Sequence, residues 1–94
     1  MLTSNTYFDG KVKSIAFDTT TLPATIGVMD KGEYTFTTDY KEIMTVVSGK
    51  LVVKLPNSDE WQTFINGQVF EVEKGASFDL KVDSHTAYMC QYIR

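Results

Sequence analysis

Cysteine, positive charge and long apolar segments are all scarce in this sequence of 94 residues. The single cysteine, Cys90, excludes an internal disulfide and is typical of a protein from a reducing compartment. A formal net charge of −3 provides no basic surface for nucleic acid or for an anionic membrane. The apolar runs are too short to cross a bilayer, and the N-terminus lacks the basic start and apolar middle of a signal peptide. We therefore expect a cytoplasmic protein without nucleic-acid or membrane partners.

The length of the chain predicts one domain with a small core. A chain of 94 residues corresponds to a single domain, 1–94, that buries roughly 60–65% of its unfolded surface. The hydrophobic fraction of 43% is ordinary for a folded globular chain. Because so small a core is thin, association with a second copy would bury more apolar surface, and we expect a homodimer.

Short segments of alternating apolar and polar residues follow one another along the chain. Side chains alternate between the two faces of a strand, so this pattern predicts strands with one buried face. Turn formers separate the segments, and Asn66-Gly67 is the strongest hairpin signal because both residues tolerate a positive φ. Strands are predicted at 11–17, 24–29, 50–55, 61–65, 69–72, 77–82 and 86–93, with two more within 32–49. Eight or nine strands about ten residues apart predict an all-β sandwich or barrel.

The segment 32–49 contains the most informative residue of the sequence, Glu42. This carboxylate begins a run, 43–47, that is apolar apart from Thr45. Burying a carboxylate without partners is unfavourable. Glu42 therefore lies either at the mouth of a barrel, paired with a lysine such as Lys41, or inside the barrel with a chemical role.

Two short motifs resemble those of the cupin superfamily. Glu42, six further residues and Gly49 resemble the end of the first cupin motif. Gly67, the turn that begins with Glu73, and Phe78 resemble the second, with Glu73 where cupins usually have proline.

Segments spread over nearly the whole chain, from about Asn5 to the C-terminus, match a more specific pattern. They are Tyr7-Phe8-x-Gly10-Lys11-Val12-Lys13-Ser14-Ile15, Gly27-Val28-Met29, Gly32-Glu33-Tyr34-Thr35-Phe36, Glu42-x-Met44-Thr45-Val46-Val47-Ser48-Gly49, Leu55-Pro56, Trp61 and Thr86-Ala87-Tyr88-x-Cys90-x-Tyr92. In these segments the chain resembles the short bacterial pyrimidine/purine nucleoside phosphorylases of the cupin superfamily. The resemblance implies a single cupin-like jelly-roll β-barrel, usually a dimer, that cleaves nucleosides with phosphate to free base and pentose 1-phosphate.

The resemblance also bears on metal binding. A metal-binding cupin uses two histidines and a glutamate from the first motif and a histidine from the second, and these positions correspond here to Phe36, Thr38, Glu42 and Phe78. One carboxylate cannot hold a transition metal, which needs three or four N, O or S donors. The single histidine, His85, lies in a polar turn, where a solvated side chain is expected. We therefore expect no metal and no cofactor other than phosphate as co-substrate, and aromatic walls that suit a purine or pyrimidine ring.

If Glu42 points into the interior, strand alternation determines which other side chains also point inward. From this set we predict substrate binding by Tyr34, Phe36, Thr38, Met44, Phe78 and Tyr88. The alternative is core packing, because such side chains fill small barrels whether or not a ligand binds, and it is favoured for Met44 and Phe78. Cys90 shares a face with Tyr88 and Tyr92 and is interpreted as a small core residue.

Phosphorolysis requires stabilisation of an oxocarbenium-like transition state and a phosphate site on the face of the pentose opposite the base. Glu42 is the predicted catalytic residue, through its charge and by binding ribose hydroxyls. The predicted phosphate-binding residues are Lys11, Lys13, Thr45 and Ser48. The two lysines have an alternative role in guarding a strand edge. The single arginine, Arg94, ends the chain and could clamp phosphate only if the C-terminus folds back.

The sequence thus predicts a metal-independent phosphorylase of purine and pyrimidine nucleosides that works by positioning and electrostatics without a covalent intermediate. Two alternatives stay open. One is a non-catalytic cupin that binds a small aromatic metabolite, and the other is a dimerisation module whose interior is filled by side chains.

Overall fold

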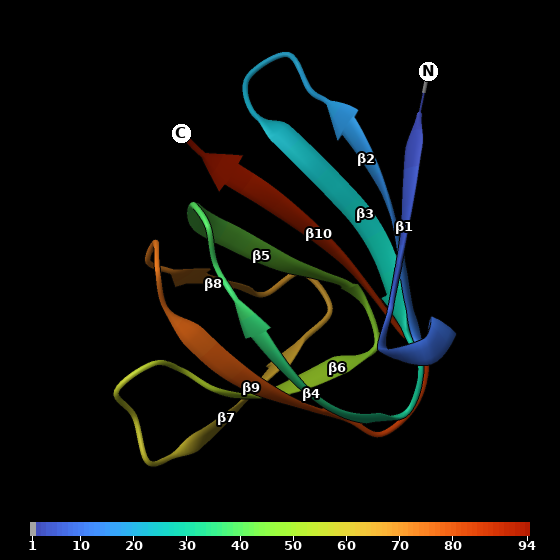
Figure 1. Ribbon diagram of the computed structural model, residues 1–94. Coiled ribbons are helices and arrows are strands. Elements are labelled where there is room, and N and C mark those ends of the chain that lie inside the picture. Colours follow the sequence, from blue (N-terminus) through green and yellow to red (C-terminus); the bar gives the residue numbers. More distant parts are fainter. Residues whose placement is uncertain (1) are drawn as a thin grey trace.

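Ten β-strands dominate the structure, a computed structural model that describes residues 2–94 (Figure 1). The strands are β1 (Thr3–Tyr7), β2 (Val12–Asp18), β3 (Pro23–Met29), β4 (Gly32–Thr37), β5 (Lys41–Ser48), β6 (Lys50–Lys54), β7 (Trp61–Ile65), β8 (Val69–Val72), β9 (Ser77–Val82) and β10 (Thr86–Ile93). One 3-10 turn, η1 (Phe8–Gly10), joins β1 to β2, and residues 2–94 contain no α-helix. Accordingly, this part of the chain has no helix with the length and hydropathy that a membrane span requires.

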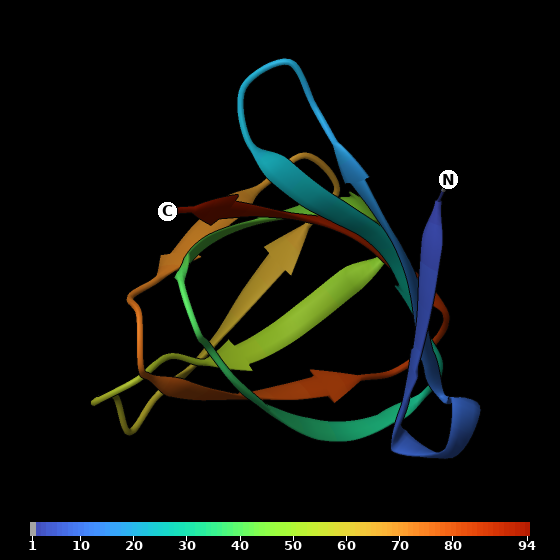
Figure 2. The ribbon, with the colours of Figure 1, turned by 45° about the horizontal axis from the view of Figure 1, so that its top comes forward.

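The strands form two antiparallel sheets. The six-stranded sheet has the order β1-β2-β3-β10-β5-β8, and the four-stranded sheet has the order β4-β9-β6-β7. Figure 2 shows the two sheets curving around a common interior. The predicted all-β fold is confirmed. The predicted jelly-roll barrel is not closed, because no strand of one sheet pairs with a strand of the other within residues 2–94.

The prediction of eight or nine strands was also wrong, because it missed β1. This strand pairs with β2 along its whole length, from Thr3 opposite Ala16 to Tyr7 opposite Val12. Its sequence, Thr-Ser-Asn-Thr-Tyr, has no apolar alternation, and most of its side chains are exposed. Main-chain hydrogen bonds to β2, and not an apolar face, therefore hold β1 at the sheet edge, so the alternation signal is absent.

The inner faces of the two sheets pack together and form the core. Tyr34 of β4 lies opposite Leu80 of β9, and Phe36 lies opposite Phe78. The rings of Phe36 and Phe78 stack with centroids 5.9 Å apart at an interplanar angle of 24°. The other buried side chains of the core cluster come from both sheets and are Val12, Met29, Met44, Val46, Leu51, Val53, Phe70, Val72, Val82, Tyr88 and Cys90. Strand alternation therefore decides which side chains turn toward the interior, and packing between the sheets encloses them.

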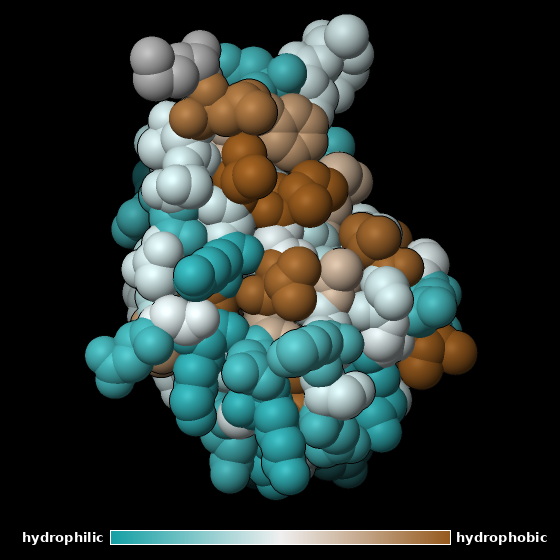
Figure 3. Space-filling model, turned by 90° about the vertical axis from the view of Figure 1, so that its right-hand side faces the viewer, coloured by the Kyte–Doolittle hydropathy of each residue, from teal (hydrophilic) through white to brown (hydrophobic). Residues whose placement is uncertain are grey.

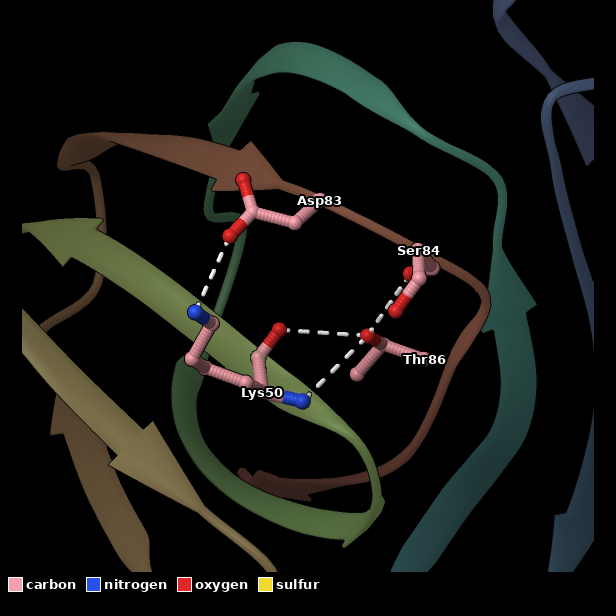
Figure 4. Close-up of polar contacts among 4 residues, drawn as sticks. All are labelled: Lys50, Asp83, Ser84 and Thr86. Carbon is pink, nitrogen blue, oxygen red and sulfur yellow. Dashed lines mark hydrogen bonds and ion pairs between the residues drawn. The ribbon is translucent and has the colours of Figure 1, made fainter.

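Buried Thr86 links the two sheets at one corner (Figure 4). Its hydroxyl lies 3.1 Å from the main-chain oxygen of Lys50 and 3.0 Å from that of Ser84, to either of which it can donate. It also accepts from the main-chain N–H of Lys50 at 3.4 Å. Because Thr86 begins β10 of the six-stranded sheet and Lys50 begins β6 of the four-stranded sheet, one hydroxyl holds both sheets together. The nearby ion pair of Lys50 with Asp83, at 2.9 Å, is exposed and contributes little.

Buried Thr38 has the same function at the end of β4. Its hydroxyl donates to the main-chain oxygen of Glu73 at 2.7 Å and accepts from the N–H of Ala76 at 3.0 Å. Its carbonyl accepts from the N–H of Gly75, also at 3.0 Å. These partners lie in the turn from β8 to β9, where the chain passes from the six-stranded to the four-stranded sheet.

The hydroxyl at the first corner makes a testable contribution to stability. In the Thr86→Val variant the shape of the side chain is kept, but the main-chain groups of Lys50 and Ser84 lose their buried partner. We expect the free energy of unfolding to fall by about 1–3 kcal/mol in a urea titration. Thr63→Val, at an exposed position of β7, is the matched control and should change stability by less than about 0.5 kcal/mol. Equal stability of the two variants would contradict this role.

Candidate functional site

A cavity of about 420 Å³ lies between the two sheets, a volume typical of small-molecule sites. Its two walls differ in chemistry. The six-stranded sheet contributes most of the polar groups, from Ser14, Thr25, Glu42, Tyr88, Cys90 and Tyr92. The four-stranded sheet contributes Phe36, Thr37 and Phe78. The exposed residues Asp39, Tyr40 and Arg94 lie at the rim. The lining is completed by Tyr7, Pro23, Met29 and Met44.

Glu42 is half-buried in the polar wall, on β5 opposite Tyr92 of β10. The thiol of Cys90 donates a hydrogen bond to Glu42 Oε1 across 3.4 Å. Burial raises the pKa of Glu42 above its ordinary value, the thiol acts in the opposite direction, and the nearby charge of Asp39 raises the pKa further. Burial also strongly raises the pKa of Cys90, so this thiol stays neutral and acts as a donor.

The charge of Glu42 is not neutralised by Lys41. The ammonium group of Lys41 lies 3.2 Å from Glu71 and 3.5 Å from Glu73. Glu42 forms no salt bridge with any residue of the range 2–94. Its carboxyl therefore faces the cavity beside hydroxyl and thiol groups and near the carboxylate of Asp39, where it can interact with a ligand.

Two phenols, Tyr88 and Tyr92, share the polar wall with Glu42, and Tyr92 is the one that lies opposite it. The hydroxyls of Tyr92 and Thr25 share a hydrogen bond of 3.1 Å. Burial raises the pKa of Tyr88 to about 12, with the neighbouring Ser14 hydroxyl acting in the opposite direction. Burial likewise raises the pKa of Tyr92 far above its ordinary value, with the Thr25 hydroxyl opposing. Both phenols therefore keep their protons at neutral pH and can donate or accept hydrogen bonds.

Gly27 of β3 sets the position of the Tyr88 ring. A Cβ atom at Gly27 would lie 2.7 Å from the ring and from the hydroxyl of Tyr88, closer than van der Waals contact allows. Glycine lets the phenol lie against the β3 backbone, as glycine does where a group approaches a strand closely. With any larger residue at position 27, the ring or the β3 backbone would have to shift.

The structure brings most of the predicted substrate-binding residues together. Phe36, Met44, Phe78 and Tyr88 line the cavity with Glu42. Tyr34 is not among the lining residues, because it lies in the core, where its hydroxyl donates to the main-chain oxygen of Asp30 at 2.6 Å. Thr38 points inward but is buried in the corner contacts of β4. The binding roles themselves stay predictions.

The predicted phosphate-binding residues lie away from the cavity lining. Lys11 and Lys13 are exposed, and Thr45 and Ser48 also do not line the cavity. Alternation on β2 directs Lys13 to the outer face, since Val12 and Ser14 face inward. Arg94 does line the cavity, because β10 extends to Ile93 and carries the last residue to the rim.

No group of three or more His, Cys, Asp or Glu side chains that could hold a metal occurs within residues 2–94. Phe36 and Phe78, which the resemblance to cupins aligns with two histidine positions, both line the cavity. His85 is exposed and pairs with Asp30 at 3.2 Å. The donors present therefore do not form a transition-metal site of the usual composition.

The sequence interpretation missed Ser14, Thr25 and Tyr92 as cavity residues and treated Cys90 as a core residue. A signal was present for Ser14, since it lies between Val12 and Ala16 on the strand face opposite Lys13. A small polar residue on a buried face is informative because it needs a partner there. Thr25 lies in a strand without clear alternation, and only the pairing of β3 with β10 places it beside Tyr92.

The raised pKa of Glu42 predicts a pH-dependent stability. The folded state holds the proton more tightly than the unfolded state, so the free energy of unfolding falls as pH rises from the ordinary pKa of 4.5 through the raised value. We expect Glu42→Gln to gain stability relative to the wild type between about pH 4 and pH 7, measured by urea titration. Glu33→Gln removes the same charge from an exposed position and corrects for net charge. A constant difference between wild type and Glu42→Gln over this interval would contradict the prediction.

Comparisons with known proteins identify the family of the chain. Residues 2–92 match the family model described as pyrimidine/purine nucleoside phosphorylase. A pyrimidine/purine nucleoside phosphorylase of Saccharophagus degradans is 73% identical over 94 residues, 100% of each chain. A crystal structure of a protein of unknown function from Vibrio parahaemolyticus superposes with a TM-score of 0.95 at 45% identity, covering 99% of each chain.

A more distant structure extends the likeness in fold. An RmlC-like cupin from Shewanella frigidimarina has a TM-score of 0.75 at 18% identity, covering 93% of this chain and 79% of the other. At that identity the similarity establishes the cupin-like fold only. The family match and the full-length identity go further: this chain belongs to the pyrimidine/purine nucleoside phosphorylase family.

Proposed function

We propose that this protein cleaves purine and pyrimidine nucleosides with inorganic phosphate, releasing the free base and pentose 1-phosphate. The observation that carries the proposal is the half-buried carboxyl of Glu42 in a cavity of about 420 Å³, facing an aromatic wall. A flat heterocycle attached to a polyhydroxylated sugar fits such a site. The relatives that share this family support the same reaction class.

Glu42 is the proposed catalytic residue. In phosphorolysis a phosphate oxygen forms a bond to C1′ of the pentose, the C1′–N bond breaks, and its electron pair leaves with the base. The proton that the base finally takes up comes from the phosphate, so the reaction is balanced. Positive charge develops on the pentose ring in the transition state. An ionised Glu42 without a salt-bridge partner among residues 2–94 can stabilise that charge and accept hydrogen bonds from ribose hydroxyls.

Phosphate is proposed to enter from the rim of the cavity. Arg94 supplies a cationic side chain on the lining there, and a guanidinium binds phosphate oxygens in a bidentate manner. The predicted roles of Lys11, Lys13, Thr45 and Ser48 would need phosphate at the outer surface or a contribution from a second copy of the chain.

The reaction is proposed to need no metal and no organic cofactor. The support is the composition of the cavity, whose single half-buried carboxyl and phenyl rings do not make up a three- or four-donor set. We further propose that residues 1–94 form one jelly-roll domain of cupin type, open between its two sheets. A cytoplasmic location suits the single cysteine, which is free and buried.

The reaction is tested by incubating the protein with uridine or adenosine, with and without phosphate, and measuring released base by chromatography. Base release should require phosphate. Glu42→Gln keeps the size of the side chain but removes its charge, so we expect kcat/KM to fall about 10²-fold or more. Glu33→Gln, on the exposed face of β4, should retain full activity.

The reaction, the role of Glu42 and the metal independence can each be contradicted by a separate result. No base release from a nucleoside panel would leave the non-catalytic cupin that binds an aromatic metabolite. Undiminished turnover in Glu42→Gln would remove Glu42 from the mechanism. Loss of activity with a strong chelator, restored by an added divalent metal, would overturn metal independence.

We also propose that the protein forms a homodimer through the outer face of the six-stranded sheet. Three apolar side chains gather there: Ile15 of β2, 45% exposed, and Ile26 and Val28 of β3, 41% and 48% exposed. Ile15 pairs directly with Ile26, so the three lie on one face. Figure 3, which views the side that carries β1 to β3, shows apolar side chains in a band over this region. Exposed apolar patches of this kind mark association surfaces, and a second copy supplies a matching apolar face.

The oligomeric state tests this surface. Light scattering after size exclusion should give about twice the chain mass of 10.6 kDa, and Ile26→Asp should shift the protein to the monomer mass, because a charge would be buried in the interface. Ile65→Asp, at an exposed position of β7 in the other sheet, should leave the mass of the wild type. A monomeric wild type, or a dimer that survives Ile26→Asp, would disprove this interface.

A further inference from the structure

The two walls of the cavity offer different interactions to a bound nucleoside. On one side the stacked rings of Phe36 and Phe78 form an apolar surface, and the hydroxyl of Thr37 on that side is hydrogen-bonded to Ser77 at 3.1 Å. On the other side the six-stranded sheet presents hydroxyl, thiol and carboxyl groups. A nucleoside has the same two parts, a flat heterocycle and a sugar whose hydroxyls each donate and accept hydrogen bonds.

The polar wall keeps unused hydrogen-bonding capacity. A hydroxyl has one donor and two acceptor positions, and the hydrogen bond between Thr25 and Tyr92 uses only one donor and one acceptor of the pair. The neutral thiol of Cys90 donates to one oxygen of Glu42, and the carboxyl retains further acceptor positions. These groups come from β3, β5 and β10, which are adjacent in the sheet, so they lie close together in a wall that Met29 and Met44 also line.

We propose that the pentose binds against the polar wall at Thr25, Glu42 and Tyr92, and that the base lies against the rings of Phe36 and Phe78. This assignment rests on the proposed phosphorolysis and adds the orientation of the substrate to it. It makes Tyr92 and Thr25 the residues that recognise the sugar and Phe36 the residue that holds the base.

The opposite orientation is unfavourable for two physical reasons. It would place the ribose hydroxyls on phenyl rings, where each loses its hydrogen bonds to water without replacement. It would also leave the hydroxyls of the polar wall against the face of the base. The proposed orientation instead puts Glu42 on the pentose side, where the transition-state charge develops.

The orientation has a consequence for specificity. Phenyl rings stack on any heterocycle, so they distinguish a purine from a pyrimidine only weakly. Hydrogen-bonding side chains reject a ligand that lacks the matching hydroxyl much more strongly. The enzyme should therefore tolerate changes of base and respond to the loss of hydroxyls from the sugar.

The test compares the binding of the two products by isothermal titration calorimetry. In Tyr92→Phe, and separately in Thr25→Val, the Kd for ribose 1-phosphate should rise about 3- to 10-fold because one hydrogen bond is lost. The Kd for free adenine or uracil should change less than 2-fold. In Phe36→Leu the pattern should reverse, with the base bound about 5- to 10-fold more weakly and ribose 1-phosphate unaffected.

Two matched controls separate binding from general loss of structure. Phe64→Leu removes a ring from the core outside the cavity lining, and Thr63→Val removes an exposed hydroxyl. Neither should alter the Kd for either product. Unfolding curves establish that each variant is folded before titration.

Kinetics give a second readout. For each protein, kcat/KM is measured for uridine and for its 2′-, 3′- and 5′-deoxy analogues. The ratio of uridine to at least one analogue should differ about 3- to 10-fold between Tyr92→Phe and the wild type. The ratio of adenosine to uridine should be the same in both proteins. If the variants weaken both products equally, or if Phe36→Leu weakens ribose 1-phosphate, the orientation is overturned although the phosphorolysis stands. If the wild type neither cleaves nucleosides nor binds ribose 1-phosphate, the proposed function fails and the orientation with it.

Discussion

Glu42 carries its carboxyl into the wall of a cavity where the neighbouring groups are a thiol, phenols and the carboxylate of Asp39. Partial removal of water from an ionised group is unfavourable, and within residues 2–94 no salt bridge compensates it. The fold must therefore hold Glu42 in place by other means. It does so through main-chain pairing, because β5 lies between β10 and β8 and pairs with both. An electrostatically unfavourable residue is thus placed on a strand that is paired along both of its edges.

The two sheets are joined without a closed barrel, and buried threonines at the corners provide the connection. Thr86 links β10 to β6, and Thr38 links the end of β4 to the turn between β8 and β9. Each hydroxyl satisfies main-chain groups that the turns leave without a strand partner, which matters because an unsatisfied buried group costs about 1–3 kcal/mol. The Thr86 corner lies at one end of the interior, and the Thr38 corner lies at the other end, next to Asp39 and Tyr40 at the rim of the cavity. The apolar core and the polar cavity therefore share the same pair of sheets.

Strand alternation predicted much of this arrangement correctly. It identified the strands from β2 to β10 and placed Phe36, Met44, Phe78 and Tyr88 on inner faces. It failed where main-chain hydrogen bonding decides the structure without apolar burial, as in β1. It also treated Tyr34 and Thr38 as equivalent to Phe36, because alternation reports which face a side chain occupies and not how far along the strand the cavity extends. Residue types indicated that Lys11 and Lys13 suit phosphate, but both lie outside the cavity lining.

The sequence by itself determined the all-β class, the family pattern and the presence of a carboxylate at the head of an apolar strand, since all three are recorded in local order and residue type. Only the tertiary structure decided that the sheets stay open, that Thr25 and Tyr92 meet across β3 and β10, and that Arg94 reaches the rim of the cavity. The physical reason is that these features depend on which strands pair and in what register. Residues 67 positions apart come within 3.1 Å through that pairing, and no local pattern encodes it.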